Sequence, residues 1–114
     1  MSSKDENSLK AILEAISKIH RFTRDHSDPD SFNKDDKAFD AVMMNFIVIG
    51  EMVSRIGPSL KKANPQIDWN RIKGFRNLAA HDYFGIDAEE VWQIIVNDLT
   101  KLKNEIDNIL SGSF

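Results

Sequence analysis

The stretch FDAVMMNFIVIGEMV, residues 39–53, is unusually apolar and sets the fold prediction. Its apolar side chains recur at three- and four-residue spacing, which predicts a helix that ends at Gly57 and Pro58. Between residues 41 and 49 only Asn45 is polar. More than one face of this helix must therefore be covered, either by two neighbouring helices or by another subunit.

The segments on both sides show the same helical spacing and carry helix start signals. Further helices are predicted at about residues 8–24, from residue 69 to about 79, and from residue 88 to about 111. Their candidate N-caps are Asn7 or Ser8, then Asp68, then Asp87 with the capping-box partner Glu90. Residues 26–36, which include a proline, are predicted to be a loop, and residues 59–67 a short connection.

Four helices joined by short links, with no alternating strand pattern, predict an all-α antiparallel four-helix bundle of the up-and-down type. A length of 114 residues allows one domain, residues 1–114, with loose ends at residues 1–7 and 111–114. The chain contains no cysteine, which excludes a disulfide scaffold, thiolate-bound zinc and a cysteine nucleophile. It has neither a signal-like start nor an apolar run of about 18 residues, so a cytoplasmic protein is expected.

The charge of the chain is unevenly distributed. The net charge is −3, which on average argues against a nucleic-acid partner. Between Arg55 and Arg76, however, six residues are basic and one is acidic. A local basic surface can attract a phosphate-bearing ligand on an acidic protein, and Arg71 and Lys73 are candidate contacts. The alternative is an ordinary solvated face.

The run RNLAAHDY, residues 76–83, gathers the side chains best suited to chemistry. It contains a guanidinium, an amide, an imidazole, a carboxylate and the only tyrosine of the chain, in Arg76, Asn77, His81, Asp82 and Tyr83. No glycine-rich phosphate loop, serine elbow or His-Glu-x-x-His motif occurs. The three histidines stand in separate contexts, so neither a metal nor another cofactor is expected.

Helical geometry separates these side chains into two groups. At about 100° per residue, Asn77 and His81 share one side of a continuous helix, and Arg76 and Tyr83 share another. A two-fold dimer in which this helix faces its own copy would bring two arginines and two histidines into one cleft. Such a cleft suits metal-free cleavage of an RNA phosphodiester, with His81 transferring protons and Arg76 binding the phosphate.

Each of these residues also has a purely structural interpretation. Arg76 and His81 are compatible with a surface ion pair or a partly buried imidazole, and Tyr83 with a half-buried ring. Glu51 in the apolar helix is either a buried carboxylate paired with a cation or a contact of the Arg76 and His81 cleft.

The motif and its surroundings resemble one family. The run Arg76-Asn-x-x-x-His81-x-Tyr83 resembles the Arg-x4-His-x-Tyr motif of HEPN-domain proteins, specifically the HepT-like toxins of prokaryotic toxin–antitoxin pairs. The resemblance extends over nearly the whole chain. It includes Asp40-Ala-Val with Ile49-Gly-Glu51, the approach Trp69-x-x-Ile-x-Gly-x-Arg-Asn77, and Tyr83-Phe-x-Ile-Asp87 followed by Val91-Trp92.

This resemblance implies a HEPN-like bundle that dimerises through the motif helices. It also implies cleavage of RNA, either tRNA or mRNA, without a metal. Arg76 and His81 would be catalytic, with supporting roles for Asn77, Asp82 and Glu51. The resemblance also implies a minimal nucleotidyltransferase antitoxin that transfers AMP to Tyr83 and thereby blocks the RNA site. Two other interpretations stay open: a non-catalytic nucleotide- or RNA-binding subunit that docks a nucleotidyltransferase, and a purely structural dimerisation bundle.

Overall fold

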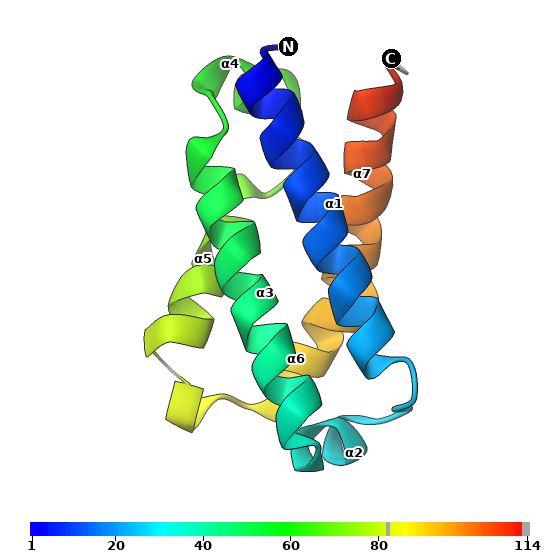
Figure 1. Cartoon of the computed structure of the whole chain (residues 1–114). Helices are drawn as coiled ribbons and strands as arrows, with labels where there is room; N and C mark the ends of the chain where they lie inside the picture. Colours follow the sequence, from blue (N-terminus) through cyan, green and yellow to red (C-terminus); the bar gives the residue numbers. More distant parts are fainter. Residues whose placement is uncertain (82, 113–114) are drawn as a thin grey trace.

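The computed structural model describes residues 1–81 and 83–112 and consists of packed helices (Figure 1). The first three long helices are α1 (Ser3–Thr23), α3 (Asp36–Arg55) and α5 (Trp69–His81). The final long helix comprises α6 (Ala88–Gln93), η2 (Ile94–Asp98) and α7 (Leu99–Ser111). Successive long helices run antiparallel, so that α1 begins and α7 ends at the same end (Figure 1). The predicted all-α bundle is confirmed, and the described residues contain no strand.

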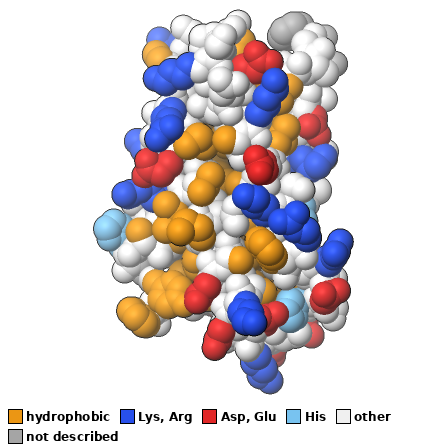
Figure 2. Space-filling model, in the orientation of Figure 1, with side chains coloured by type: hydrophobic (Ala, Val, Ile, Leu, Met, Phe, Trp, Pro, Cys, Tyr) orange, Lys and Arg blue, Asp and Glu red, His pale blue; other side chains and the backbone are white. Residues whose placement is uncertain are grey.

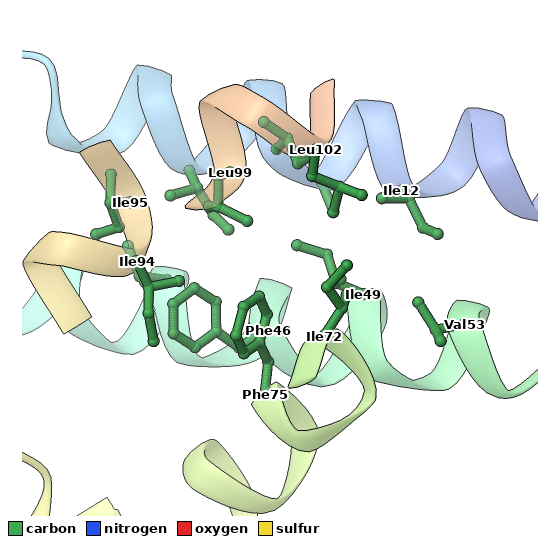
Figure 3. Packing of buried hydrophobic residues seen from close by; sticks show 14 of the residues in the cluster. Ile12, Phe46, Ile49, Val53, Ile72, Phe75, Ile94, Ile95, Leu99 and Leu102 are labelled. Atoms are coloured by element: carbon green, nitrogen blue, oxygen red, sulfur yellow. The ribbon is translucent and has the colours of Figure 1, made fainter. Parts of the chain in front are cut away.

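Helix α3 packs between two other long helices, so more than one of its apolar faces is covered. It packs against α1 on one side and α5 on another. Phe46 of α3 is fully buried and stacks on Phe75 of α5 with ring centroids 5.2 Å apart. Figure 3 shows this ring pair beside the buried aliphatic residues of the final helix, Ile94, Ile95, Leu99 and Leu102. The core therefore joins all four long helices.

The first helix begins five residues earlier than predicted. Its N-cap is Ser2, whose hydroxyl accepts a hydrogen bond from the backbone N–H of Asp5 at 3.1 Å. Acidic residues in the first turn complement the helix dipole. The predicted cap at Asn7 or Ser8 is wrong because both residues already lie within the helix, where Ser8 is buried.

Two segments predicted as a loop and a connection contain short helices, α2 (Pro29–Lys34) and α4 (Pro58–Ala63). Each begins with a proline in the first turn, where the missing N–H costs no hydrogen bond. Asp28 caps α2 by accepting from the N–H of Ser31 at 2.8 Å. The prediction of non-helical structure at residues 26–36 is therefore wrong for its central part.

The other predicted helix starts agree with the structure. Asp68 accepts from the N–H of Arg71 at 3.1 Å at the start of α5, and Asp87 accepts from Glu89 at 3.0 Å at the start of α6. The final helix contains the five-residue π-helical segment η2, which the sequence did not predict. Between α5 and α6 the chain forms the 3₁₀ turn η1 (Tyr83–Gly85). No helix among the described residues is long and apolar enough to cross a membrane.

Candidate active site

Arg76 lies in α5 where this helix approaches α3 most closely. The contact point on α3 is Gly50, and a Cβ atom built there would stand 2.6 Å from Cβ of Arg76 and 2.9 Å from the carbonyl oxygen of Lys73. No side chain fits in this space. Gly50 therefore lets the two backbones approach and fixes the position from which Arg76 extends.

The guanidinium of Arg76 pairs with the carboxylate of Glu51, the residue after Gly50. The contact joins Nε of Arg76 to Oε1 of Glu51. The arginine and glutamate side chains are 43% and 42% exposed, although the contacting Nε atom of Arg76 is itself buried. Glu51 is therefore not a buried carboxylate, and of the two interpretations of this residue the structure supports contact with Arg76 at the surface.

His81 is the last residue of α5 and is exposed. It borders a shallow hollow of about 390 Å³ together with Leu78, Phe84, Gly85, Ile86, Asp87 and Glu90. The imidazole makes no hydrogen bond to the part of the chain that the structure describes. Among the described residues, neither ring nitrogen of His81 is engaged, so the imidazole at the border of the hollow keeps its capacity to donate and accept a proton there.

The other two histidines, His20 and His26, make hydrogen-bond contacts within the fold. His20 places Nε2 at 3.3 Å from the carbonyl oxygen of Ile95, which links α1 to the final helix. His26 lies between Ser31 and Asp35, with Nδ1 at 2.6 Å from the serine hydroxyl and Nε2 at 2.9 Å from the carboxylate. Both rings have structural partners, which distinguishes them from His81.

Tyr83 lies in η1, next to α3. Its hydroxyl donates a hydrogen bond to Oδ1 of Asp40, and its ring packs edge-on against Phe39 with centroids 5.7 Å apart. The hydrogen bond to Asp40 raises the pKa of the phenol above its ordinary value; partial burial and the negative charges of Asp40 and Asp36 shift it in the same direction. The interpretation of Tyr83 as a half-buried ring is correct for its packing, and its hydroxyl binds a carboxylate.

The remaining candidate residues occupy different environments. Asn77 and Lys73 are exposed on α5. Arg71 donates from both Nε and Nη2 to Oδ2 of Asp98 in η2, at 2.9 and 2.6 Å, so its guanidinium already has a partner. Asp82 lies outside the described residues.

The Arg76 and His81 side chains leave α5 in different directions. Five residues of helix correspond to a rotation of about 140° and a rise of about 7.5 Å. Arg76 is directed to α3 and Glu51, whereas His81 borders the hollow formed with η1 and the start of α6. The helical rotation therefore starts the two side chains on different sides of α5.

Asp40 and Gly50 were not among the predicted site residues, although both belong to the segment that resembles the family. Gly50 had a recognisable signal, since an isolated glycine within an apolar helix often marks close packing. Asp40 had none, because its partner Tyr83 is 43 residues away. Among the described residues, no group of three or more histidine and acidic side chains is arranged to hold a metal ion.

These features define a helical protein of the HEPN type with an Arg-x4-His-x-Tyr motif at the end of its third long helix. The chain matches the family described as "Ribonuclease HepT-like" over residues 12–109. It therefore belongs to the HepT-like family.

Several archaeal proteins are similar to this chain along most of its length. Two are named as candidate RNases of Methanocaldococcus jannaschii. One is 32% identical over 108 residues, covering 94% of this chain and 98% of the relative. The other is 35% identical over 102 residues, covering 90% of this chain and 84% of the relative. A third, from Thermococcus cleftensis, is named "Probable ribonuclease HepT" and is 31% identical over 109 residues, covering 96% and 98%. No solved structure matches the chain.

Proposed function

We propose that this protein is a metal-independent endoribonuclease and the toxin of a toxin–antitoxin pair. Its active site combines Arg76 and His81 from two copies of the chain. Family membership and relatives named as ribonucleases support the reaction class. The proposed substrate is RNA, and the proposed compartment is the cytoplasm.

The observation that carries this proposal is the difference between His81 and the other two histidines. His20 and His26 are engaged in contacts that hold helices together. His81 is exposed at a hollow and has no partner among the described residues. An exposed imidazole is suited to move a proton to or from RNA near neutral pH.

Two observations support a site shared between two copies. The first is the rotation of about 140° between Arg76 and His81 on α5, which separates them within one chain. The second is a row of apolar side chains on α3 that one chain leaves uncovered: Met44 is 61% exposed, and Val48 and Met52 follow it at four-residue spacing, both partly exposed. Figure 2 shows hydrophobic side chains gathered on the face over α3 and near η1. A second copy covering this face would add its own motif helix.

The proposed reaction uses the two groups in separate roles. A neutral His81 accepts the proton of the ribose 2′-hydroxyl or, when protonated, donates one to the leaving 5′ oxygen. Arg76 donates hydrogen bonds to the phosphate oxygens as negative charge develops on them. Because Glu51 holds the same guanidinium in the free protein, RNA binding requires the phosphate to displace or share this carboxylate. Asn77 and Lys73, both exposed on α5, would support phosphate binding.

The proposed antitoxin is a minimal nucleotidyltransferase that transfers AMP to Tyr83. This residue follows His81 by two positions and lies in the turn that also contributes Phe84 and Gly85 to the hollow. An AMP group here would add a phosphodiester anion and a nucleoside to the turn that follows His81. It would exclude RNA by occupying the space and by charge repulsion.

RNA cleavage in the presence of EDTA tests this proposal. Purified wild-type protein and the His81→Ala variant are incubated with total RNA and tRNA, and the new ends are analysed. We expect 2′,3′-cyclic phosphate ends with the wild type and loss of cleavage with the variant. His20→Gln serves as the matched control, because it removes an imidazole from a structural contact and is expected to keep the activity.

Absence of cleavage by folded, dimeric and unmodified wild-type protein would contradict the catalytic proposal. That result would favour a nucleotide- or RNA-binding subunit that regulates a nucleotidyltransferase. Equal cleavage by the His81→Ala variant would instead show that another residue carries the reaction.

A further inference from the structure

The side chain of Asp40 has a single hydrogen-bond partner among the described residues, and this partner is the hydroxyl of Tyr83. The aspartate is exposed in the second turn of α3, forms no ion pair with the described residues and caps no helix. Among the described residues, its carboxylate therefore makes no structural interaction besides the hydrogen bond from the phenol hydroxyl.

The position of the phenol is defined from three directions. Phe39 contacts the ring edge-on from α3 at 5.7 Å, and Phe84 contacts it edge-on from the same turn at 5.2 Å. The hydrogen bond to Asp40 then fixes the rotation of the hydroxyl group. Since Asp40 is exposed and Tyr83 is only partly buried, the oxygen lies at the surface, where a second protein can reach it.

A phenol is a poor nucleophile while it keeps its proton. Its ordinary pKa is 10.0, and its surroundings here raise the pKa further. A carboxylate already hydrogen-bonded to the hydroxyl supplies what the reaction needs, because it accepts the proton as the new bond forms. This is the relation between a nucleophile and an adjacent general base, with both groups supplied by the same chain.

We propose that Asp40 is the proton acceptor and positioning residue for nucleotidyl transfer to Tyr83, an inference that rests on the proposed function of this tyrosine. The phenol oxygen attacks the α-phosphorus of a nucleoside triphosphate held by the partner nucleotidyltransferase. The bond between the α-phosphorus and its bridging oxygen breaks, and pyrophosphate leaves. The phenolic proton passes to Oδ1 of Asp40. The acceptor protein thus contributes a base as well as the hydroxyl that receives the nucleotide.

The first test measures the coupling of the two groups without any partner protein. Tyr83 is the only tyrosine of the chain, so the absorbance change on phenolate formation reports this residue alone. Asp40→Asn removes the charge and is expected to lower the phenol pKa toward 10.0. Asp36→Asn is the matched control on the same helix; Asp36 is the weakest of the groups that act on the phenol, so its variant should shift the titration much less. An unchanged titration in Asp40→Asn would overturn the coupling.

The second test measures nucleotidyl transfer with labelled ATP and a minimal nucleotidyltransferase, with mass spectrometry to locate the label. We expect Asp40→Asn to slow labelling of Tyr83 at least tenfold, Asp40→Glu to restore part of the rate and Asp36→Asn to match the wild type. The exposed position of Asp40 means that none of these variants removes a buried group. Unfolding curves check that all of them fold.

The outcomes distinguish the modification of Tyr83 from the role of Asp40 in that modification. Wild-type labelling at Tyr83 with an equal rate in Asp40→Asn would overturn the role of Asp40 and leave the proposed modification standing. Absence of label on wild-type Tyr83, or label on another residue, would overturn the proposed modification and the role of Asp40 with it.

Discussion

Gly50 of α3 lies directly against Arg76 of α5, with space for a hydrogen but not for a methyl group. A Cβ atom on Gly50 would come within 2.6 Å of Cβ of Arg76 and within 3.0 Å of its backbone nitrogen. Because backbone atoms lie on the far side of this contact, a side chain at position 50 must push the two helices apart. The position of the motif arginine thus depends on a residue of another helix that has no side chain.

Replacement of Gly50 by alanine is expected to destabilise the protein by about 1–3 kcal/mol, as overpacking of a well-packed core does. Cleavage of RNA should fall as well, because Arg76 is displaced. Urea unfolding and RNA cleavage of the same preparation measure both effects. Gly74→Ala is the matched control, since nothing lies within 4 Å of its Cβ and alanine favours the helix by up to about 1 kcal/mol. Equal stability of both variants would show that the close contact does not matter.

Removal of the charge of Glu51 should release Arg76 for phosphate. Exposed ion pairs contribute about 0.2–1 kcal/mol, so Glu51→Gln is expected to tighten RNA binding by up to about fivefold at low salt. Fluorescence anisotropy with a short RNA in the His81→Ala background gives the affinity without cleavage. Glu14→Gln, which breaks a pair with Lys18 on α1, is the control. Weaker binding by Glu51→Gln would mean that the carboxylate supports the RNA site instead of competing for it.

The two basic candidates of α5 should contribute unequally to RNA binding. Lys73 is exposed and has no ion-pair partner among the described residues, whereas Arg71 is held by Asp98. We therefore expect Lys73→Ala to weaken RNA binding and to reduce the slope of log affinity against log salt by about one. Arg71→Ala should have a smaller effect on both the affinity and the slope. Salt titrations of both variants decide this. A larger effect of Arg71→Ala would show that RNA displaces Asp98.

Acid should destabilise the protein partly through Asp35. The N–H of Ala38 and the ring of His26 both bind its carboxylate and hold its pKa below the ordinary 3.8. A lowered folded-state pKa means that the contribution to stability is complete above about pH 4 and is lost as the pH falls through the lowered value. Between pH 6 and pH 2, the free energy of unfolding should therefore fall less steeply for Asp35→Asn than for the wild type. Identical pH dependence in both proteins would contradict this role.

Much of the fold could be predicted because helical periodicity is a local property of the sequence. The stretch at residues 39–53 and the caps Asp68 and Asp87 were recognised in this way. Prediction from local sequence failed where one residue is compatible with two local structures. Pro29 is typical of a loop, but a proline after Asp28 also suits the first turn of a helix, which is what forms.

The site was predictable only as far as the motif extends along the chain. Arg76, His81 and Tyr83 stand close together in sequence, and their chemistry is visible from residue types alone. Their partners come from α3: Glu51 beside Arg76, and Asp40 beside Tyr83. Such contacts depend on how α3 and α5 pack, which no local pattern specifies. The pairing of Arg71 with Asp98 was missed for the same reason.

In the proposed dimer, Arg76 of one copy and His81 of the other act on the same phosphate. Mixing the inactive variants Arg76→Ala and His81→Ala, with separate affinity tags to isolate the mixed dimer, tests it most directly. The cleft of that dimer keeps one Arg76 and one His81, which come from different copies, so cleavage should return. A mixed dimer that assembles and stays inactive would contradict the shared site.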